Sequence, residues 1–251
     1  MPTRVATANI LYKLGRGDAR EALHQVLAEE PDLVGLQEWY ISRVDMLRET
    51  GTVRTVPGLP VRLPRRTPPD YHWVSSVACG NVVGARADRF DLLDAKAVLL
   101  SGIGKSDRPD RAFGTEPPRL VTVGVYADRR VERTVALMSY HLAPGVEKYG
   151  KYIDDRPRMR ARHEQEVARL QVLIAEHQRA GHVVYAVGDS NFHLQRLSGL
   201  TSSWESREDD PGTIGSRTRK LDDIHGPGPA TAVRLLTTPS DHRAVIAERE
   251  N

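Results

Sequence analysis

The apolar residues at the start of the chain predict a strand, a helix and a second strand. Arg4–Leu11 has the pattern of a buried strand, and residues 32–38 form a short apolar run that ends on the carboxylate of Glu38. Between them, Asp18–Glu30 has apolar residues at helical spacing, with Asp18 as the expected N-cap. A strand that ends on an acid can place that acid at the edge of a sheet.

The rest of the chain predicts many short strands and few helices. One apolar face predicts the longest helix over Arg156–Arg179, and Ser42–Thr50 is typical of a shorter one. Residues 54–70 hold five prolines and four arginines and predict an irregular surface segment, and residues 101–118 predict a long loop. The other expected strands are His72–Ala78, Gly80–Ala85, Lys96–Leu100, Arg119–Tyr126, Thr134–Tyr140, Val183–Val187, Leu221–Ile224, Ala232–Leu236 and Ala244–Ala247.

This order of elements predicts an α/β fold, in which two sheets of short strands lie between helical layers. A chain of 251 residues can form one large domain or two small ones, and no repeat or linker divides it, so we expect a single domain over residues 1–251. Its 39% hydrophobic and 27% charged residues exclude wholesale disorder.

The single cysteine and the lack of a long apolar run bear on location. Cys79 has no second cysteine to pair with, so an internal disulfide is excluded, and we expect a small buried side chain beside Gly80. No stretch approaches the roughly 18 apolar residues of a membrane span, and the N-terminus lacks the pattern of a signal peptide. We therefore expect a soluble cytoplasmic protein without a membrane partner. We also expect a monomer.

The charge is nearly balanced, but the basic residues are unusual. The net charge is +3, and 30 of the 36 basic residues are arginine. The planar guanidinium suits phosphate groups, so this surplus is compatible with a phosphate-bearing partner.

Polar residues that can do chemistry follow the predicted strands where each apolar run ends. A single Asp, Asn or His in such a place is commonly turn chemistry. Together, however, they form recognisable local sequences: Gly-Asp-Ser-Asn at 188–191 after a buried strand, and Ser-Asp-His at 240–242 before the last one. The set comprises Asn9, Glu38, His141, Asp189, Asn191, Asp222, Asp223, Asp241 and His242.

These motifs and their order resemble the endonuclease/exonuclease/phosphatase superfamily, which includes deoxyribonucleases and inositol polyphosphate phosphatases. The resemblance extends from about Thr7 to Val245, nearly the whole chain. It implies a four-layer α/β/β/α sandwich of two mostly antiparallel sheets flanked by helices, with the active site at one end of the paired sheets. It also implies metal-dependent hydrolysis of a phosphoester.

The resemblance assigns metal binding to three positions. Glu38 matches the metal-binding glutamate of the superfamily, Asn9 matches its strand-end asparagine, which also contacts substrate, and Asp241 corresponds to a ligand or outer-sphere acid. Such oxygen ligands suit Mg²⁺ or Mn²⁺.

The catalytic assignments come from the same resemblance. Asp189 and Asn191 would orient the attacking water and the phosphate oxygens, and His141 would contact the scissile phosphate. Asp222 and His242 would form a pair in which the carboxylate fixes the ring tautomer and raises its basicity. Arg119, at the start of a strand, is a further candidate for phosphate binding. The mechanism implied is in-line attack by water, with no covalent intermediate.

Three positions differ from the usual motifs. Ser190 occupies the place of a common phenylalanine, which predicts looser local packing, and Leu11 occupies the place where AP endonucleases have an acid. Asp223 follows Asp222, and the alternation of side chains along a strand favours Asp222 as the residue that faces the site.

Three functions remain open from the sequence. Arginines in 54–66, at 156, 158, 160 and 162, and at 217 and 219 with Lys220 favour a nuclease that acts on DNA or RNA. Aromatic residues make up only 6% of the chain, which argues against an extensive base-stacking surface. The alternatives are hydrolysis of a small soluble phosphoester and, less favoured because every motif position is filled, an inactive binding protein.

Overall fold

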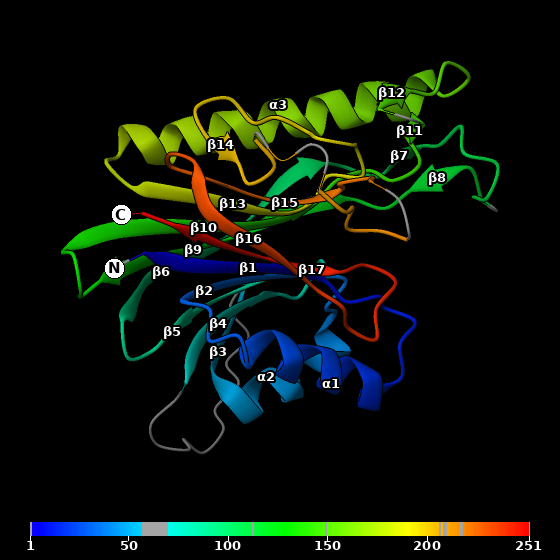
Figure 1. Ribbon diagram of the computed structural model, residues 1–251. Coiled ribbons are helices and arrows are strands. Elements are labelled where there is room, and N and C mark those ends of the chain that lie inside the picture. Colours follow the sequence, from blue (N-terminus) through cyan, green and yellow to red (C-terminus); the bar gives the residue numbers. More distant parts are fainter. Residues whose placement is uncertain are drawn as a thin grey trace.

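A computed structural model describes residues 2–56, 70–111, 113–148, 150–205, 207, 210–215 and 218–250. Two sheets lie face to face, with α3 over the outer side of one and α1 and α2 over the outer side of the other (Figure 1). This is the predicted four-layer sandwich. Among the described residues, no helix has the length and apolar character required to cross a membrane.

The first sheet has seven strands in the order β16-β17-β1-β2-β5-β4-β3. The pairs β1·β2 and β3·β4 are parallel and the other neighbours are antiparallel, as expected for a mostly antiparallel sheet. Its strands are β1 (Thr3–Asn9), β2 (Leu33–Gln37), β3 (Gly51–Val56), β4 (Tyr71–Ser76), β5 (Val82–Arg86), β16 (Ala230–Leu236) and β17 (Ala244–Arg249).

The second sheet has six strands in the order β14-β15-β13-β10-β9-β6. Only β10 and β13 are parallel within it, with His141 opposite Asp189. Its strands are β6 (Phe90–Ser101), β9 (Arg119–Asp128), β10 (Arg133–His141), β13 (Val183–Asp189), β14 (Thr201–Ser202) and β15 (Asp222–Gly226).

The helices bury the faces that their apolar spacing predicts. In α1 (Arg16–Leu27) the buried face is alanine, leucine and valine against the first sheet, and in α3 (Pro157–Arg179) it includes Leu170 and Ile174 against the second. The short helices are η1 (Ile41–Arg43) and α2 (Val44–Thr50). The N-cap of α1 is Gly15 rather than Asp18, which lies in the first turn, where its charge favours the helix dipole.

Several elements differ from the sequence predictions. Residues 51–56 form strand β3 because they pair with β4, although their composition resembles the irregular segment that follows. Of that segment, predicted for 54–70, residues 57–69 lie outside the described residues. The loop at 101–118 contains a hairpin of β7 (Gly104–Lys105) and β8 (Thr115–Glu116), and the loop after β10 contains β11 (Glu147–Lys148) and β12 (Lys151–Tyr152). Strands of two residues leave no periodicity to detect.

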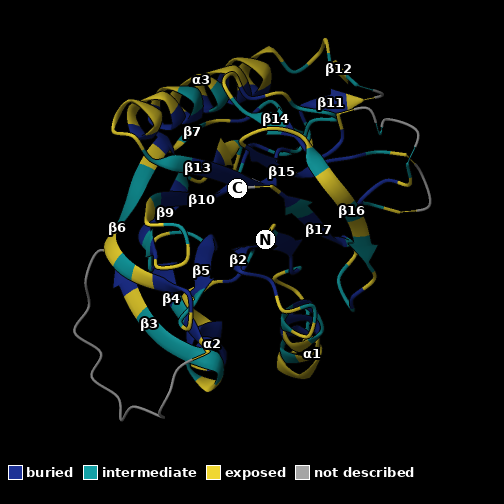
Figure 2. Ribbon diagram, turned by 60° about the vertical axis from the view of Figure 1, so that its left-hand side comes forward, coloured by how far each residue is buried: buried dark blue, intermediate teal, exposed yellow. Residues whose placement is uncertain are grey.

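The main core lies between the two sheets, and burial falls from there toward the outer helices (Figure 2). The sheets approach closely at Gly35, where an added Cβ would lie 2.1 Å from Cγ2 of Val187. Both chain ends lie at one end of the sandwich, and the loops with the β7·β8 and β11·β12 hairpins lie at the other (Figure 1). The strands therefore deliver their polar ends to the end of the sandwich away from the termini.

Candidate active site

Strand pairing gathers the predicted residues at one end of the sandwich. Asn9, the last residue of β1, pairs with Gln37 at the end of parallel β2, so the following Glu38 lies beside it. In the other sheet, the last residues of parallel β10 and β13, His141 and Asp189, pair with each other. Asp222 begins β15 opposite Asp189, because these two strands are antiparallel.

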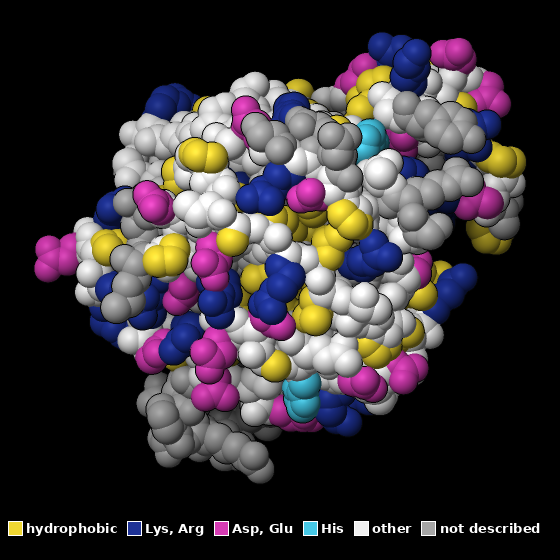
Figure 3. Space-filling model, viewed as in Figure 1, with side chains coloured by type: hydrophobic (Ala, Val, Ile, Leu, Met, Phe, Trp, Pro, Cys, Tyr) yellow, Lys and Arg dark blue, Asp and Glu magenta, His cyan; other side chains and the backbone are white. Residues whose placement is uncertain are grey.

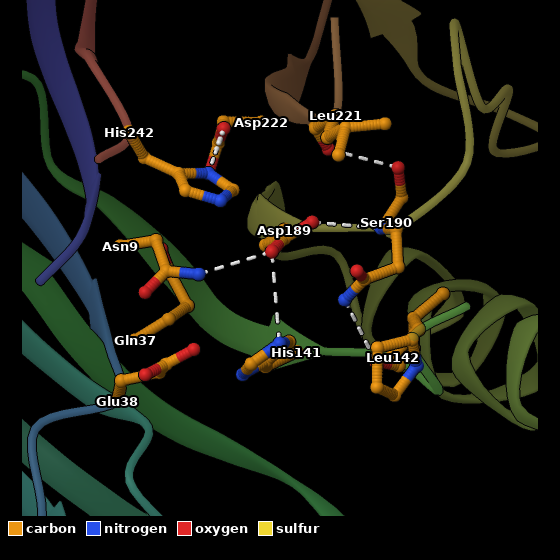
Figure 4. Close-up of polar contacts among 12 residues, drawn as sticks. Asn9, Gln37, Glu38, His141, Leu142, Asp189, Ser190, Leu221, Asp222 and His242 are labelled. Atoms are coloured by element: carbon orange, nitrogen blue, oxygen red, sulfur yellow. Dashed lines mark hydrogen bonds and ion pairs between the residues drawn. The ribbon is translucent and has the colours of Figure 1, made fainter. Parts of the chain in front are cut away.

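Asp189 is the centre of the hydrogen-bond network (Figure 4). Its Oδ2 accepts a hydrogen bond from Nδ2 of Asn9 at 3.0 Å and lies 3.6 Å from Nε2 of His141. Its Oδ1 accepts the backbone N–H of Asn191 at 2.7 Å. Asn191 has a φ of +52°, which asparagine tolerates, and its Nδ2 donates to the carbonyl of Leu142. The buried carboxylate thus joins the two sheets and the loop after β13.

Asp222 and His242 form the expected pair. Nδ1 of His242 lies 2.7 Å from Oδ2 of Asp222, which is fully buried. Atoms of Asp189, Asp222 and His242 that could bind a metal all lie within 4.8 Å of one another. Asp223 points to the other side of β15, where it accepts a hydrogen bond from Ser202. The predicted choice of Asp222 over Asp223 therefore agrees with the geometry.

Asn9 and Glu38 have donor atoms that fit a hard divalent cation. Oδ1 of Asn9 is buried and has no hydrogen-bond partner among the described residues, and it points toward the Glu38 carboxylate (Figure 4). Oε2 of Glu38 accepts the backbone N–H of Tyr12 at 2.9 Å, which fixes the carboxylate. Mg²⁺ and Mn²⁺ favour such oxygen ligands.

Asp241 does not join this group. Its side chain is exposed, and its Oδ1 lies 3.3 Å from Oγ of Ser240. The geometry brings together every other predicted residue of the network, while a ligand role for Asp241 stays a prediction.

The two histidines have opposite charge preferences. Burial, together with the charge of Arg119, lowers the pKa of His141 to about 3. Burial also opposes the charged form of His242, but the attraction and hydrogen bond of Asp222, with the charges of Asp189 and Asp241, raise its pKa to about 10. The metal-free site at neutral pH thus combines a neutral His141 with a cationic His242.

This difference can be measured by NMR titration of the histidine ring nitrogens in the metal-free protein. We expect His242 to stay protonated from pH 6 to about pH 10 and His141 to stay neutral down to about pH 3. Because the folded-state pKa of His242 lies above its ordinary value, its stabilising contribution is complete below pH 6.5 and disappears as the pH rises toward 10. Asp222→Asn should lower this pKa, and an unchanged pKa would contradict the pairing.

An open pocket of about 550 Å³ adjoins the network. Arg119 lies on its wall, with Nη1 3.5 Å from the carbonyl of His141 and a buried Nε that has no partner among the described residues. Arg108 and Arg111, from the β7·β8 hairpin, pair with Asp110 and Glu116 respectively. Besides these arginines, the lining includes Tyr12, Glu38, Tyr40, Cys79, Asn81, His141, Asp189, Asn191 and His242.

Ser190, which replaces a common phenylalanine, is held by hydrogen bonds. Its Oγ lies 2.8 Å from the carbonyls of Leu221 and Phe192, and its own carbonyl lies 2.8 Å from Nε2 of His163. The buried hydroxyl is thus satisfied by hydrogen bonds, while looser packing than with phenylalanine stays a prediction.

We expect Ser190→Ala to lower the free energy of unfolding by about 1 kcal/mol, because it removes the hydroxyl and leaves buried carbonyls less satisfied. Urea denaturation measures this change. The exposed Ser198 supplies the control, since Ser198→Ala should have little effect. Equal midpoints for Ser190→Ala and the unmutated protein would show that the hydrogen bonds contribute nothing.

Several residues that hold the site in place were not predicted from the sequence. Glu166 on α3 accepts the backbone N–H of Ala143 at 2.7 Å and holds the loop after His141. Ser240 Oγ donates to the carbonyl of Asn9 at 2.7 Å and accepts from the N–H of Leu11. Glu166 could have been predicted only from its position, because it is an acid on the apolar face of the helix α3.

The basic runs mostly lie outside the pocket. Arg160 pairs with Glu164 on the surface of α3, Arg162 pairs with buried Glu166, and Arg219 pairs with Glu147. Lys220 is buried, so it offers no surface charge. Arg217 and most of the 54–66 run lie outside the described residues.

Cys79 is half-buried rather than buried, with Sγ 3.9 Å from Oγ1 of Thr122, and it lines the pocket.

No protein-family model and no curated protein matches the sequence. Solved structures do match. A mannosyl-6-phosphatase from Bacteroides thetaiotaomicron is 19% identical with a TM-score of 0.66, covering 99% of this chain and 100% of its own. D. rerio TDP2, solved with a single-strand DNA product, is 14% identical with a TM-score of 0.65, covering 100% and 99%. An endonuclease/exonuclease/phosphatase family protein from the same Bacteroides species is 18% identical with a TM-score of 0.65, covering 99% and 94%. The chain therefore has the endonuclease/exonuclease/phosphatase fold.

Proposed function

We propose that this protein is a metal-dependent phosphoester hydrolase, and that its preferred substrates are phosphodiesters of nucleic acid. The observation that carries the proposal is the Asp189 network, in which Asn9, His141 and Asn191 meet one buried carboxylate beside the Asp222–His242 pair. Because these residues come from both ends of the chain, we also propose that residues 1–251 act as one domain.

Asn9 and Glu38 are the residues that would hold Mg²⁺ or Mn²⁺. The unpartnered Oδ1 of Asn9 and the fixed carboxylate of Glu38 support this assignment. When bound, such a cation neutralises charge on the phosphate and on the leaving oxygen. Asp241 remains a proposed outer ligand.

The protein's own side chains account for the remaining roles. Asp189 would position the attacking water and accept its proton. His242, which is cationic at neutral pH, would share the proton on its Nε2 with the water or a phosphate oxygen, since Nδ1 is engaged with Asp222. His141, which is neutral at physiological pH, and Asn191 would hold the other phosphate oxygens. Arg119 would contact the phosphate from the pocket wall. In-line attack then breaks the bond between phosphorus and the ester oxygen, without a covalent enzyme intermediate.

Two substrate classes have support. The nucleic-acid class is supported by the likeness to TDP2, which was solved with single-strand DNA. A small soluble phosphoester is the second candidate, because a pocket of about 550 Å³ is within the size range of small-molecule sites. The likeness to a mannosyl-6-phosphatase also supports that candidate. In either case we propose a monomer in the cytoplasm, where a protein with a single cysteine needs no disulfide.

A substrate panel tests the proposal. Plasmid DNA, single-stranded DNA, RNA and small phosphoesters are incubated with Mg²⁺ or with chelator. We expect hydrolysis only with Mg²⁺, and activity on nucleic acid should fall steeply with added salt if several phosphates are bound. Hydrolysis of small esters with little dependence on salt would favour the second candidate, and no hydrolysis of any substrate would contradict the proposal.

A further inference from the structure

Two exposed tyrosines form part of the pocket. Tyr12 and Tyr40 keep 55% and 46% of their surface exposed, and both line the cavity. Their rings meet edge to face, with centroids 6.4 Å apart and an interplanar angle of 84°. Large aromatic side chains exposed together in a pocket leave ring faces available for a ligand.

Both tyrosines lie close to the proposed metal ligand Glu38. The backbone N–H of Tyr12 donates to Oε2 of Glu38, and Tyr40 is only two residues beyond Glu38. Tyr40, Glu38 and Arg119 all line the same pocket. A group bound against these rings would therefore lie beside the phosphate.

The rest of the lining is polar and includes three arginines. Arg108 and Arg111, from the β7·β8 hairpin, pair with Asp110 and Glu116, whereas Arg119 has no carboxylate partner among the described residues. The space-filling view shows a hollow at the right-hand edge, below the part of the surface formed by this hairpin (Figure 3). The pocket of about 550 Å³ is large enough for one nucleotide unit.

A cation lies over the ring of Tyr12. Nζ of Lys13 is 5.6 Å from the centroid of the Tyr12 ring, and Lys13 is exposed. It is placed to meet a phosphate next to a base that contacts Tyr12.

We propose that Tyr12 and Tyr40 form a subsite that stacks an aromatic base of the substrate beside the phosphate bound near Arg119. This inference rests on the proposed hydrolase function and specifies its substrate as a nucleotide unit, either free or in a single strand. Aromatic side chains that stack a base typically increase affinity by about 5- to 100-fold.

Calorimetric binding in Mg²⁺ buffer tests the subsite with three probes: adenosine 5′-monophosphate, ribose 5-phosphate and inorganic phosphate. The unmutated protein should bind the nucleotide about 5- to 100-fold more tightly than ribose 5-phosphate. Tyr12→Ala and Tyr40→Ala should each reduce that preference, since both keep the backbone N–H that Glu38 requires. Tyr12→Phe and Tyr40→Phe should preserve it. Phe113→Ala is the matched control, because Phe113 is 91% exposed and does not line the pocket.

The base could belong to a free nucleotide or to a single strand, and two further probes, a dinucleotide and a short single strand, distinguish these sources. Tighter binding of these, reduced by Lys13→Ala, indicates a strand, while equal binding indicates a free nucleotide; both outcomes support the subsite. Equal affinity for the nucleotide and for ribose 5-phosphate would overturn the subsite, and so would alanine variants that keep the preference, even if hydrolysis is intact. Absence of both phosphate binding and hydrolysis would instead remove the proposed function and the subsite with it.

Discussion

Asp189→Asn is expected to lower kcat for phosphodiester hydrolysis by about 10²- to 10⁴-fold. Asparagine has nearly the shape of aspartate but lacks its charge and offers one acceptor oxygen instead of two. Oδ2 of Asp189 accepts from Asn9 and Oδ1 from the N–H of Asn191, so one of these bonds would face an NH₂ group. The attacking water would also lose the anionic partner that positions it. Steady-state kinetics at saturating Mg²⁺ measure the effect.

The control for this variant is Asp223→Asn. Asp223 is a buried aspartate of the same sheet, but it bonds Ser202 on the side away from the pocket. Its replacement should affect stability while leaving kcat per folded molecule nearly unchanged. If Asp189→Asn kept more than a tenth of the activity, Asp189 would not be the centre of the reaction.

Glu38→Gln is expected to weaken Mg²⁺ binding by about 100-fold or more, since even indirect partners of metal ligands commonly change affinity 10- to 100-fold. The neutral amide keeps one oxygen but removes the charge beside Oδ1 of Asn9. Titration with Mg²⁺ or Mn²⁺ by calorimetry measures the affinity directly. High Mg²⁺ should restore part of the activity, because the other residues of the network are intact.

Glu116→Gln is the matched variant for this experiment. Glu116 is a buried glutamate on the hairpin beside the pocket, whereas Glu38 is half-buried, and Glu116 pairs with Arg111 rather than facing Asn9. Unchanged metal affinity is expected there. Equal losses in both variants would indicate a general electrostatic effect and would contradict the assignment of Glu38.

The sequence was sufficient to predict the two-sheet sandwich because its central strands and helices are long enough to show a period. Strands β1, β2, β10 and β13 have continuous apolar runs that end on polar residues, and α3 has a clear apolar face. Strand β3 was missed because its pairing with β4 outweighs its local composition. The two-residue strands at the pocket end contain too few residues to produce a pattern.

The candidate site was predictable to the extent that its residues follow strands. Parallel pairing of β1 with β2 and of β10 with β13 brings Asn9 near Glu38 and His141 near Asp189. Supporting contacts such as those of Glu166 and Ser240 depend on how a helix and a loop pack against these strand ends. That packing involves residues that are distant in the sequence, so it cannot be predicted from the spacing of residues along the chain.

The number of arginines also could not identify the phosphate-binding residue from the sequence. A count of 30 arginines suggested phosphate binding, but the structure pairs many of them with acids, as in Arg162 with Glu166 and Arg219 with Glu147. Arg119 differs because it lines the pocket and its Nε has no partner among the described residues. Burial and partners, rather than number, identify the arginine suited to phosphate.

Hydrolysis of bis(p-nitrophenyl) phosphate in ¹⁸O-labelled water, followed by mass spectrometry of the products, tests the central claim most directly. The site formed by Asn9, Glu38, Asp189 and His242 predicts one ¹⁸O atom in the phosphate product, formed with Mg²⁺ and not with chelator. Label in p-nitrophenol would instead place the attack on carbon. That result, or turnover that is equally fast in chelator, would contradict a metal-dependent attack of water on phosphorus.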